Sequence, residues 1–306
     1  MGNVFPIQKY DKRFQEYNSA QFLHDFYTIY MKAIMKSLTI FILLKIIYVE
    51  ATLFSPESYP LKDNNVPTYI EQLKSNERPD LEPINKYKIK NIFKPICENA
   101  KKLEDPDIRL TFIVKSKVRN FLRREAIRTT WGQQVRTDLP RSSIRTVFNL
   151  GTRRKKSIQD EINKEYEVYK DILQSNFYDT YFNNTLKTVM GIKWAFENCP
   201  TSDFFFFVDE DYFVATKNVC NYLLKNKKNF EKESLYMGYI HKNAVPYRTK
   251  ETKWFVSEKE YPLKEYPGYA AGGAVLYSRK AIQDIFYGIS YTQHFRFDDV
   301  FVGLVA

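Results

Sequence analysis

The sequence predicts an α/β domain with a mainly parallel β-sheet over residues 107–306. Short apolar runs alternate there with segments whose apolar residues recur at helical spacing. One run, residues 204–208, consists of four phenylalanines and a valine. A continuously apolar run bounded by polar residues is typical of a strand buried on both faces. Strands that alternate with helices indicate a Rossmann-like α/β/α arrangement, with helices covering both faces of the sheet.

Five strands and two helices are expected in this domain. The strands fall at residues 110–114, 146–150, 204–208, 235–239 and 274–277. Residues 186–196 are apolar almost all round and predict a buried helix. An earlier helix is expected from apolar and aromatic side chains at helical spacing: Ile158, Ile162, Tyr166, Tyr169 and Leu173.

The residues before the domain are expected to anchor it. Residues 33–49 are the most apolar segment, and they predict a signal-anchor helix despite Lys36 and Lys45, because lysines near helix ends reach the interface and some bilayers are thin. The alternative is a buried amphipathic helix. Basic residues precede the segment and acidic ones follow it, which predicts a cytosolic tail at residues 1–32. Residues 50–106 hold seven of the thirteen prolines and predict a mostly extended stem.

Composition narrows the possible partners. The chain has 306 residues, 44% of them hydrophobic, which is enough for one substantial core. Its net charge is +11, but the basic residues are scattered and no nucleic-acid-binding signature is present. We therefore expect no nucleic-acid partner. An anionic substrate such as a nucleotide sugar, or an anionic membrane surface, fits the charge equally well.

The cysteines and histidines give no metal or hydrolase signature. Cys97, Cys199 and Cys220 lack metal-ligand spacing and indicate neither a zinc site nor a disulfide framework. One pair can still form a bridge in an oxidising compartment. The three histidines are far apart in sequence and give no support to a Ser-His-Asp hydrolase.

Three carboxylates, Asp209, Glu210 and Asp211, follow the phenylalanine run directly. Open α/β sheets bind ligands at the C-terminal ends of their strands. Crowded carboxylates repel one another unless a cation neutralises them, and Mn²⁺ and Mg²⁺ prefer oxygen ligands. The triplet therefore predicts a metal site that also holds a diphosphate.

Two other interpretations of this triplet stay open. Asp-rich turns are common, so the triplet is also compatible with a solvated turn after a core strand. An Asp-x-Asp sequence after an apolar strand also fits phosphatases that use an aspartyl nucleophile. Those enzymes usually carry a small β-branched residue at the position where this chain has Phe213, which weakens the match.

Residues 123–132 place three arginines, a glutamate and a tryptophan after the first strand. Guanidinium groups match phosphate oxygens and stack on aromatic rings, so the segment is a candidate for holding a nucleotide. On a helix, Arg124 and Arg128 share one face. The alternative is a solvated helix that ends in a packed tryptophan.

An aromatic segment with two glycines precedes the last strand. Aromatic rings suit the apolar faces of sugars, and glycines let a ligand approach the backbone closely. Ordinary aromatic packing around a bulge is the alternative. The residues concerned are Trp254, Tyr261, Tyr266, Tyr269, Gly272 and Gly273.

Asp298 and Asp299 lie between apolar residues near the end of the chain. A carboxylate in such surroundings can acquire a pKa suited to accepting a proton from a sugar hydroxyl. A helix N-cap, which aspartate often supplies, is the alternative. Spacing alone does not separate the two.

Together these segments resemble the beta-1,3-glycosyltransferase family of beta-1,3-galactosyltransferases and beta-1,3-N-acetylglucosaminyltransferases. The resemblance covers residues 110–306. It is specific because the motifs occur in the family's order and rough spacing: residues 123–132, 181–188, Cys199-Pro200, 209–211, 253–257, 266–273 and 298–303.

The resemblance implies a type II Golgi membrane enzyme with a GT-A-type fold and a lumenal catalytic domain. It implies a UDP-sugar donor, a glycan acceptor, Mn²⁺ or Mg²⁺ as cofactor, and inversion at the anomeric carbon. Asp209 and Asp211 fall on the metal-binding motif, with Asp211 the expected direct ligand. Asp299, or else Asp298, falls on the general base. The residues expected around the donor and acceptor are Arg124, Arg128, Lys187, Asp209, Glu210, Trp254, Gly272 and Gly273.

The chain departs from the family pattern in ways that bear on activity. Asp-Glu-Asp stands where three aspartates are usual, and Asp298-Asp299 where Glu-Asp is usual. Ala270 and Val305 occupy positions of usual cysteines, and the sequence stops at Ala306, where relatives continue. We expect an inverting transferase that moves a hexose or N-acetylhexosamine in β-1,3 linkage to a glycoprotein or glycolipid. The alternative is a catalytically inactive, truncated relative that binds sugar nucleotides or glycans.

Overall fold

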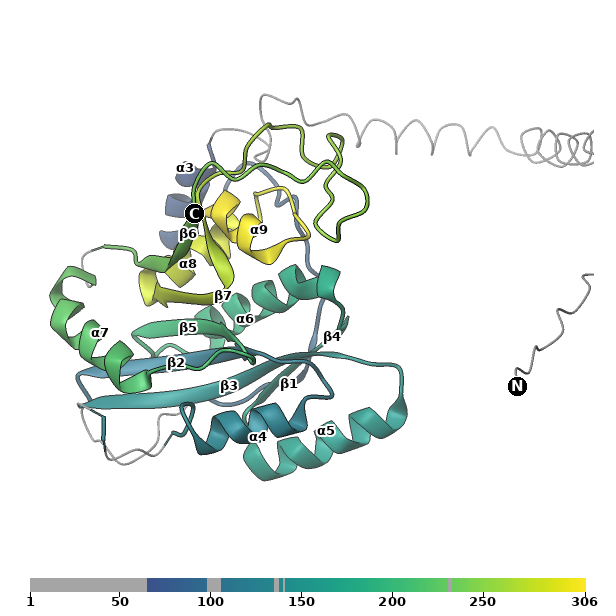
Figure 1. Cartoon of the computed structure of the whole chain (residues 1–306). Coiled ribbons are helices and arrows are strands. Elements are labelled where there is room, and N and C mark those ends of the chain that lie inside the picture. Colours follow the sequence, from purple (N-terminus) through teal and green to yellow (C-terminus); the bar gives the residue numbers. More distant parts are fainter. Residues whose placement is uncertain (1–64, 98–105, 135–137, 140, 231–232) are drawn as a thin grey trace, which may run out of the picture. The chain divides into compact units, whose positions relative to one another are not determined.

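A computed structural model describes residues 65–97, 106–134, 138–139, 141–230 and 233–306 of the chain. The described residues form a mixed sheet of seven strands in the order β1-β4-β3-β2-β5-β7-β6, with helices on both faces (Figure 1). The four central strands are parallel: β4 (Ile172–Tyr178), β3 (Ser142–Thr152), β2 (Ile108–Lys115) and β5 (Phe204–Asp209). The outer strands are antiparallel to their neighbours: β1 (Asn91–Phe93), β7 (Tyr269–Ser278) and β6 (Tyr236–His241). The predicted α/β class with a mainly parallel core is confirmed.

Two groups of helices enclose the sheet. Because successive side chains of a strand point to opposite faces, Phe205 and Phe207 join one core while Phe204 and Val208 join the other. The first core includes α6 (Asn184–Asn198), α8 (Arg279–Gly288) and α9 (Asp298–Val305). On the opposite face lie α4 (Phe121–Thr129), α5 (Lys156–Tyr169) and α7 (Thr216–Phe230).

The order of the strands reverses beside β2. The chain builds β3 and β4 outward on one side of β2, then returns and places β5 on the other side. Lys115 at the end of β2 is therefore the register partner of Asp209 at the end of β5. A crevice at the carboxyl ends of strands, at such a reversal, is where open α/β sheets bind ligands. β7 pairs antiparallel with β5, and α9 packs against β7, so both elements reach the same edge.

Most predicted elements are confirmed, and one boundary is wrong. The five expected strands overlap β2, β3, β5, β6 and β7, and the helix expected at residues 186–196 lies within α6. Leu173 was expected to continue a helix, but α5 ends at Tyr169, Lys170 turns the chain with a φ of 51°, and Leu173 lies in β4. The hydropathy pattern did not indicate β4, because this strand contains two buried polar residues. Gln174 hydrogen-bonds to the carbonyl of Gly151, and Ser175 to the side chain of Asn91.

The second half of the predicted stem differs from the expectation. Residues 66–74 form α3 (Val66–Lys74), which packs against α8, and β1 pairs with β4. Asn85 donates from its side-chain amide to the carbonyls of Ile289 and Thr292 at 2.7 and 2.6 Å. These described residues of the predicted stem therefore pack on the domain. The tail, the signal anchor and the start of the stem, residues 1–64, lie outside the described residues.

No helix within the described part of the chain is both long and apolar enough to cross a bilayer. The predicted anchor at residues 33–49 lies outside that part.

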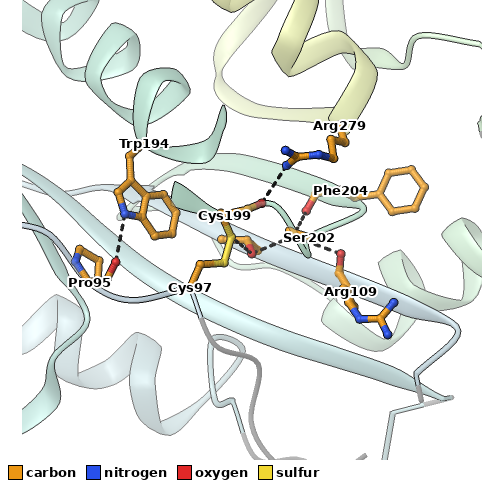
Figure 2. The surroundings of a disulfide bond; sticks show 9 residues. Pro95, Cys97, Arg109, Trp194, Cys199, Ser202, Phe204 and Arg279 are labelled. Carbon is orange, nitrogen blue, oxygen red and sulfur yellow. Dashed lines mark hydrogen bonds between the residues drawn. A yellow bond between two sulfur atoms is a disulfide. The ribbon is translucent and has the colours of Figure 1, made fainter. Parts of the chain in front are cut away.

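A disulfide between Cys97 and Cys199 holds the N-terminal segment to the core (Figure 2). Their Cα atoms are 4.9 Å apart, and both residues are buried. Next to the bridge, the Trp194 indole N–H donates to the carbonyl of Pro95 at 3.1 Å, and Arg279 donates to the carbonyl of Cys199 at 2.8 Å. Of the alternatives left open by the sequence, the structure shows one bridged pair; Cys220 is buried in the opposite core.

We expect Cys97→Ser/Cys199→Ser to lower the free energy of unfolding by about 2–5 kcal/mol, because the bridge closes a long loop in the unfolded chain. Urea unfolding of both proteins, followed by tryptophan fluorescence, measures the change. Dithiothreitol should destabilise the wild type by a similar amount and leave the double variant unchanged. Equal stability of the oxidised wild type and the variant would contradict a structural role for the bridge.

Candidate functional site

A buried lysine joins the carboxylates at the C-terminal edge of the sheet. The ammonium group of Lys115 lies 2.7 Å from the carbonyl oxygen of Gly272, 2.8 Å from Asp298 Oδ2 and 3.1 Å from Asp209 Oδ1. Its side chain is only 6% exposed. A protonated lysine has three N–H donors, and each has an acceptor here. The two predicted acidic motifs, far apart in sequence, therefore meet around one cation.

The two aspartates of α9 have different environments. Asp298 Oδ2 accepts from Lys115 and also from the hydroxyl of Thr188 at 2.8 Å. Burial raises the pKa of Asp298, but the charge of Lys115 and the bonds from Lys115 and Thr188 outweigh it and hold the pKa below its usual value. For Asp299, burial and then the charge of Asp298 raise the pKa. Asp298 is therefore held ionised, and Asp299 is the carboxylate with the higher proton affinity.

The acidic pair lies in the first turn of α9 rather than at its N-cap. Phe297 occupies the N-cap position, without a side-chain capping bond. Negative charge in the first turn of a helix is stabilised by the helix dipole. The Asp299 Oδ1 atom accepts from the backbone N–H of Val300 at 2.8 Å. The N-cap alternative is therefore not what the structure shows.

The three carboxylates at the end of β5 have different partners. Asp209 accepts from Lys115, and burial raises its pKa despite the lysine. Glu210 accepts from the Ser116 hydroxyl at 2.5 Å and also from the Asn120 side chain, so it faces the loop after β2. Asp211 is 63% exposed, and Arg123 lies 3.9 Å from it. Of these three carboxylates, Glu210 is the one held entirely by the loop after β2, so Asp209 and Asp211 are the better candidates for holding a cation from outside the protein.

The oxygen atoms at this edge suit a hard divalent ion. Among the described residues, no group of three His, Cys, Asp or Glu side chains is placed to enclose a metal. Mg²⁺ is commonly held by one or two carboxylates plus substrate phosphates, and Mn²⁺ prefers similar oxygen ligands. Asp211, exposed to solvent beside Asp209, fits this donor set. The residues are therefore compatible with a metal that binds together with a diphosphate.

Arg124 and Arg128 are used inside the protein. Arg124 is fully buried, and five hydrogen bonds engage its five donors: two to Glu165, one to Ser116, and two to the carbonyls of Lys117 and Val118. Arg128 binds Glu165 and forms a bidentate pair with Asp171. Trp131 packs in the core. The structure does not bring these arginines to the carboxylates of the site. The packed tryptophan of the alternative is present, but the helix is not simply solvated, since Arg124 is buried. Direct nucleotide contact by these arginines stays a prediction.

Lys187 also faces the loop that follows β2. Its ammonium group donates to the carbonyl of Ser116 at 2.8 Å and to Asp179 Oδ1 at 3.0 Å, and it is buried. Together with Arg124, it fixes the backbone of residues 116–118. The two cations therefore position this loop at the switch point, and their predicted contact with a nucleotide stays a prediction.

Half-exposed aromatic side chains border the site. Trp254, in the segment between β6 and β7, is 45% exposed, and Tyr181 of the 3₁₀ turn η2 (Tyr181–Asn183) is 46% exposed. The Lys253 ammonium lies over both rings, 4.6 Å from the Trp254 centroid and 5.1 Å from that of Tyr181. Burial raises the pKa of Tyr181, and the charges of Asp299, Asp298 and Asp209 add to the effect, although a hydrogen bond with Trp254 opposes it. The aromatic surface and the carboxylates are thus neighbours.

The other members of the predicted aromatic segment have structural roles. Tyr261 and Tyr266 are buried and pack against Phe295. A side chain at Gly272 would press on Asp299, with its Cβ 3.3 Å from the Asp299 Cβ, and the Tyr212 ring lies against Gly273. These glycines permit close packing of the site's own side chains.

Sequence reasoning missed Lys115, Thr188 and Tyr181. A signal was present for Lys115, because it directly follows an apolar run predicted as a central strand and therefore had to lie at the ligand-binding edge. Tyr181 and Thr188 were noted only as the ends of the motif at residues 181–188, without a role, since their roles depend on how η2 and α6 pack against the Trp254 segment and α9.

Comparison with known proteins shows which family the chain belongs to. The galactosyltransferase family model matches residues 122–306. The beta-1,3-galactosyltransferase brn of Drosophila melanogaster is 41% identical over 203 residues, which cover 66% of this chain and 61% of that protein. The beta-1,3-galactosyltransferase 5 of Mus musculus is 38% identical over 67% of this chain and 68% of that protein. The lactosylceramide 1,3-N-acetyl-beta-D-glucosaminyltransferase A of Danio rerio is 32% identical over 69% of this chain and 55% of its own length.

The fold defines an α/β protein with a mainly parallel central sheet, and acidic residues from β5 and α9 meet at its switch point. The chain belongs to the galactosyltransferase family, and the resemblance to beta-1,3-glycosyltransferases is confirmed. It spans 61%, 68% and 55% of the lengths of the three relatives named above.

We expect Glu165→Ala to lower the free energy of unfolding by about 3–5 kcal/mol at neutral pH, because it leaves two buried guanidinium groups without their shared partner. Burial raises the pKa of Glu165, but Arg124 and Arg128 outweigh it and hold the pKa below its usual value. The stabilisation that ionised Glu165 provides is therefore fully present above the pKa that Glu165 has in the unfolded chain. It is lost as the pH falls through the lower pKa of the folded state. Urea unfolding at several pH values should show the difference narrowing in acid.

The matched control is Glu161→Ala on the same helix, since Glu161 is exposed. It should change stability by less than about 0.5 kcal/mol. If both variants were equally stable, the ionic network would not hold the loop after β2.

Proposed function

We propose that the chain is an inverting, metal-dependent beta-1,3-glycosyltransferase. It moves a hexose or N-acetylhexosamine from a UDP-sugar to a sugar hydroxyl on a glycoprotein or glycolipid. The observation that carries this proposal is the meeting of Asp209 and Asp298 on Lys115 at the switch point of the sheet. Asp211 lies two residues after Asp209, and Asp299 directly follows Asp298. The family match and the names of the relatives support it.

Asp299 is the general base in this mechanism. Asp298 is already engaged by Lys115 and Thr188, whereas Asp299 is half-buried and has a raised pKa. The ionised Asp299 takes the proton of the acceptor hydroxyl while the hydroxyl oxygen bonds to the anomeric carbon. The bond from that carbon to the diphosphate oxygen breaks on the opposite face, and UDP leaves. A single displacement inverts the configuration.

Asp209 and Asp211 would hold Mn²⁺ or Mg²⁺ together with the donor diphosphate. When bound, such an ion supplies positive charge to the departing diphosphate. Asp211 is the more accessible ligand, because Asp209 is shared with Lys115. Glu210 acts indirectly, by fixing the loop of residues 116–120 through Ser116 and Asn120.

The acceptor is placed by the aromatic surface of Tyr181 and Trp254. Half-exposed rings offer flat apolar faces to the C–H side of a sugar, and Lys253 and the tyrosine hydroxyl provide polar contacts at its edge. The electrostatic coupling of Tyr181 to Asp299 supports a sugar bound here with one hydroxyl near the base.

We propose a type II Golgi membrane location with the catalytic domain in the lumen. The Cys97–Cys199 bridge supports an oxidising compartment. The apolar segment at residues 33–49, flanked by basic residues on its N-terminal side, supports the anchor and its orientation.

Purified full chain should release UDP from one of UDP-galactose, UDP-N-acetylglucosamine or UDP-N-acetylgalactosamine when Mn²⁺ and a glycan acceptor are present. Asp211→Ala should lower kcat by about 100-fold or more, since an ion supplies several kcal/mol to the transition state. Asp299→Asn should lower kcat by about 10²–10⁴-fold, the usual contribution of a general base. In the wild type, kcat should fall as the pH drops through the raised pKa of Asp299, because only the ionised form accepts a proton.

Lys193→Met is the control for these variants, because Lys193 is an exposed residue of α6 outside the site. Transfer that persists in Asp211→Ala with a chelator present would refute the metal role. Donor binding without turnover in every acceptor screen would identify the chain as a sugar-nucleotide-binding relative instead.

Trp254→Ala should raise the acceptor KM by about 3- to 10-fold, which corresponds to the loss of one aromatic contact. The donor KM should stay unchanged, because Trp254 lies on the acceptor side. Initial rates at saturating donor and varied acceptor measure both constants. Tyr247→Ala, a half-exposed ring 5.9 Å from Trp254, tests how far the surface extends. An effect on the donor KM alone would place the acceptor elsewhere.

A further inference from the structure

Lys115 is the one residue that contacts both the donor-side and the acceptor-side carboxylates among the described ion pairs of this edge. Its three acceptors come from three elements: Asp209 from β5, Gly272 from β7 and Asp298 from α9. Lys115 itself ends β2, which has parallel neighbours on both sides, so its backbone position is fixed by the sheet. The lysine thus links β5, β7 and α9 to a central strand of the sheet.

Gly272 extends this link to the base. Its carbonyl accepts from Lys115 at 2.7 Å, and its N–H donates to Asp299. A Cβ at this position would lie 3.3 Å from the Asp299 Cβ and 3.5 Å from the Lys115 ammonium. Lys115 is therefore connected to Asp299 in two ways. It hydrogen-bonds to Gly272, whose N–H donates to Asp299, and it hydrogen-bonds to Asp298, the residue before Asp299.

A buried ion pair of this kind is a poor means of gaining stability. Removing a lysine and two carboxylates from water costs several kcal/mol, and well-packed apolar side chains would stabilise the edge at least as well. Such a pair is better explained by the geometry it imposes. Here that geometry sets the separation between the carboxylates that would hold the metal and the carboxylate that would accept the proton.

We propose that Lys115 is a positioning residue for the transfer reaction, which fixes Asp298 and Gly272 and thereby presents Asp299 at a set distance from Asp209. This inference rests on the proposed function. Lys115 itself touches neither the acceptor hydroxyl nor the anomeric carbon. Its effect reaches the reaction through the placement of the base and through the positive charge that it keeps beside Asp298.

Removal of Lys115 should alter the pH dependence of transfer. Without the cation, the charge of Asp298 acts on Asp299 uncompensated, so the acid limb of kcat should move to higher pH. Several titratable or charged groups surround Asp299, and Lys115→Met changes only one of them. They are Asp298 of α9, Lys115 of β2, Tyr181 of η2, Tyr236 of β6, and Tyr269 and Tyr277 of β7.

The test compares Lys115→Met, Asp298→Asn and the double variant in the full chain, with Lys193→Met as control. Lys115→Met should lower kcat by about 100-fold, the usual result of misplacing a catalytic group by about 1 Å, with little change in acceptor KM. Its acid limb should lie at higher pH than that of the wild type. A kcat within threefold of the wild type and an unchanged pH profile would overturn the proposal.

The double variant separates positioning from stability. Lys115→Met leaves Asp298 and Asp209 without their shared cation, while the double variant removes the more buried of these two charges, so the melting temperature should fall in Lys115→Met and recover in part in the double variant. Under the proposal kcat stays low in the double variant although stability returns. Recovery of kcat together with stability would show a merely structural role. If Lys115→Met alone does not fold, kcat and the melting temperature of the double variant still distinguish a positioning role of Lys115 from a structural one.

A crystal structure of the double variant gives a readout that does not depend on activity. Displacement of Gly272 and the first turn of α9 by about 1 Å supports positioning, and an unchanged edge overturns it. If the wild type transfers no sugar from any donor, the proposed function fails, and this structural comparison still tests whether Lys115 sets the geometry of the edge.

Discussion

The ion pairs of Lys115 are the interaction on which the site depends. Carboxylates from β5 and α9 would repel one another at this spacing, and a single ammonium group permits them to share the edge of the sheet. The same cation makes the two aspartates of α9 unequal, since Asp298 is satisfied by the lysine and Asp299 is not. One interaction thus determines both the shape of the site and the division of roles within it.

A second layer of buried charge supports the loop beside this lysine. Arg124 and Lys187 hold the backbone carbonyls of residues 116–118, while Glu165 and Asp179 balance their charges. Arg128 extends the network to Asp171 and stacks between Phe148 and Tyr169. Most of the basic residues that suggested a nucleotide-binding segment are therefore structural, and they act on ligands only through the loop that they fix.

The central sheet could be predicted because its strands are continuous apolar runs, and the phenylalanine strand was the clearest of them. β4 escaped prediction because its buried Gln174 and Ser175 find hydrogen-bond partners that only the folded sheet provides. The same limit applies to the site. Asp209, Asp211 and Asp299 were recognisable by residue type and position, but the roles of Lys115, Thr188 and Tyr181 follow from contacts across elements far apart in sequence. Arg124 shows the converse, since a residue suited to phosphate is here fully engaged by the protein itself.

The bridge between Cys97 and Cys199 turns part of the backbone into a covalent ring, and the position of Lys115 relative to that ring matters for assembly. The lysine lies inside the ring, while Asp209, Gly272 and Asp298 all lie on the chain that follows it. A polypeptide made from its N-terminus completes every residue of the ring before any of these acceptors exists. The ammonium group consequently cannot reach its full set of acceptors until α9 has been synthesised, so assembly of this edge of the sheet follows synthesis of the whole ring.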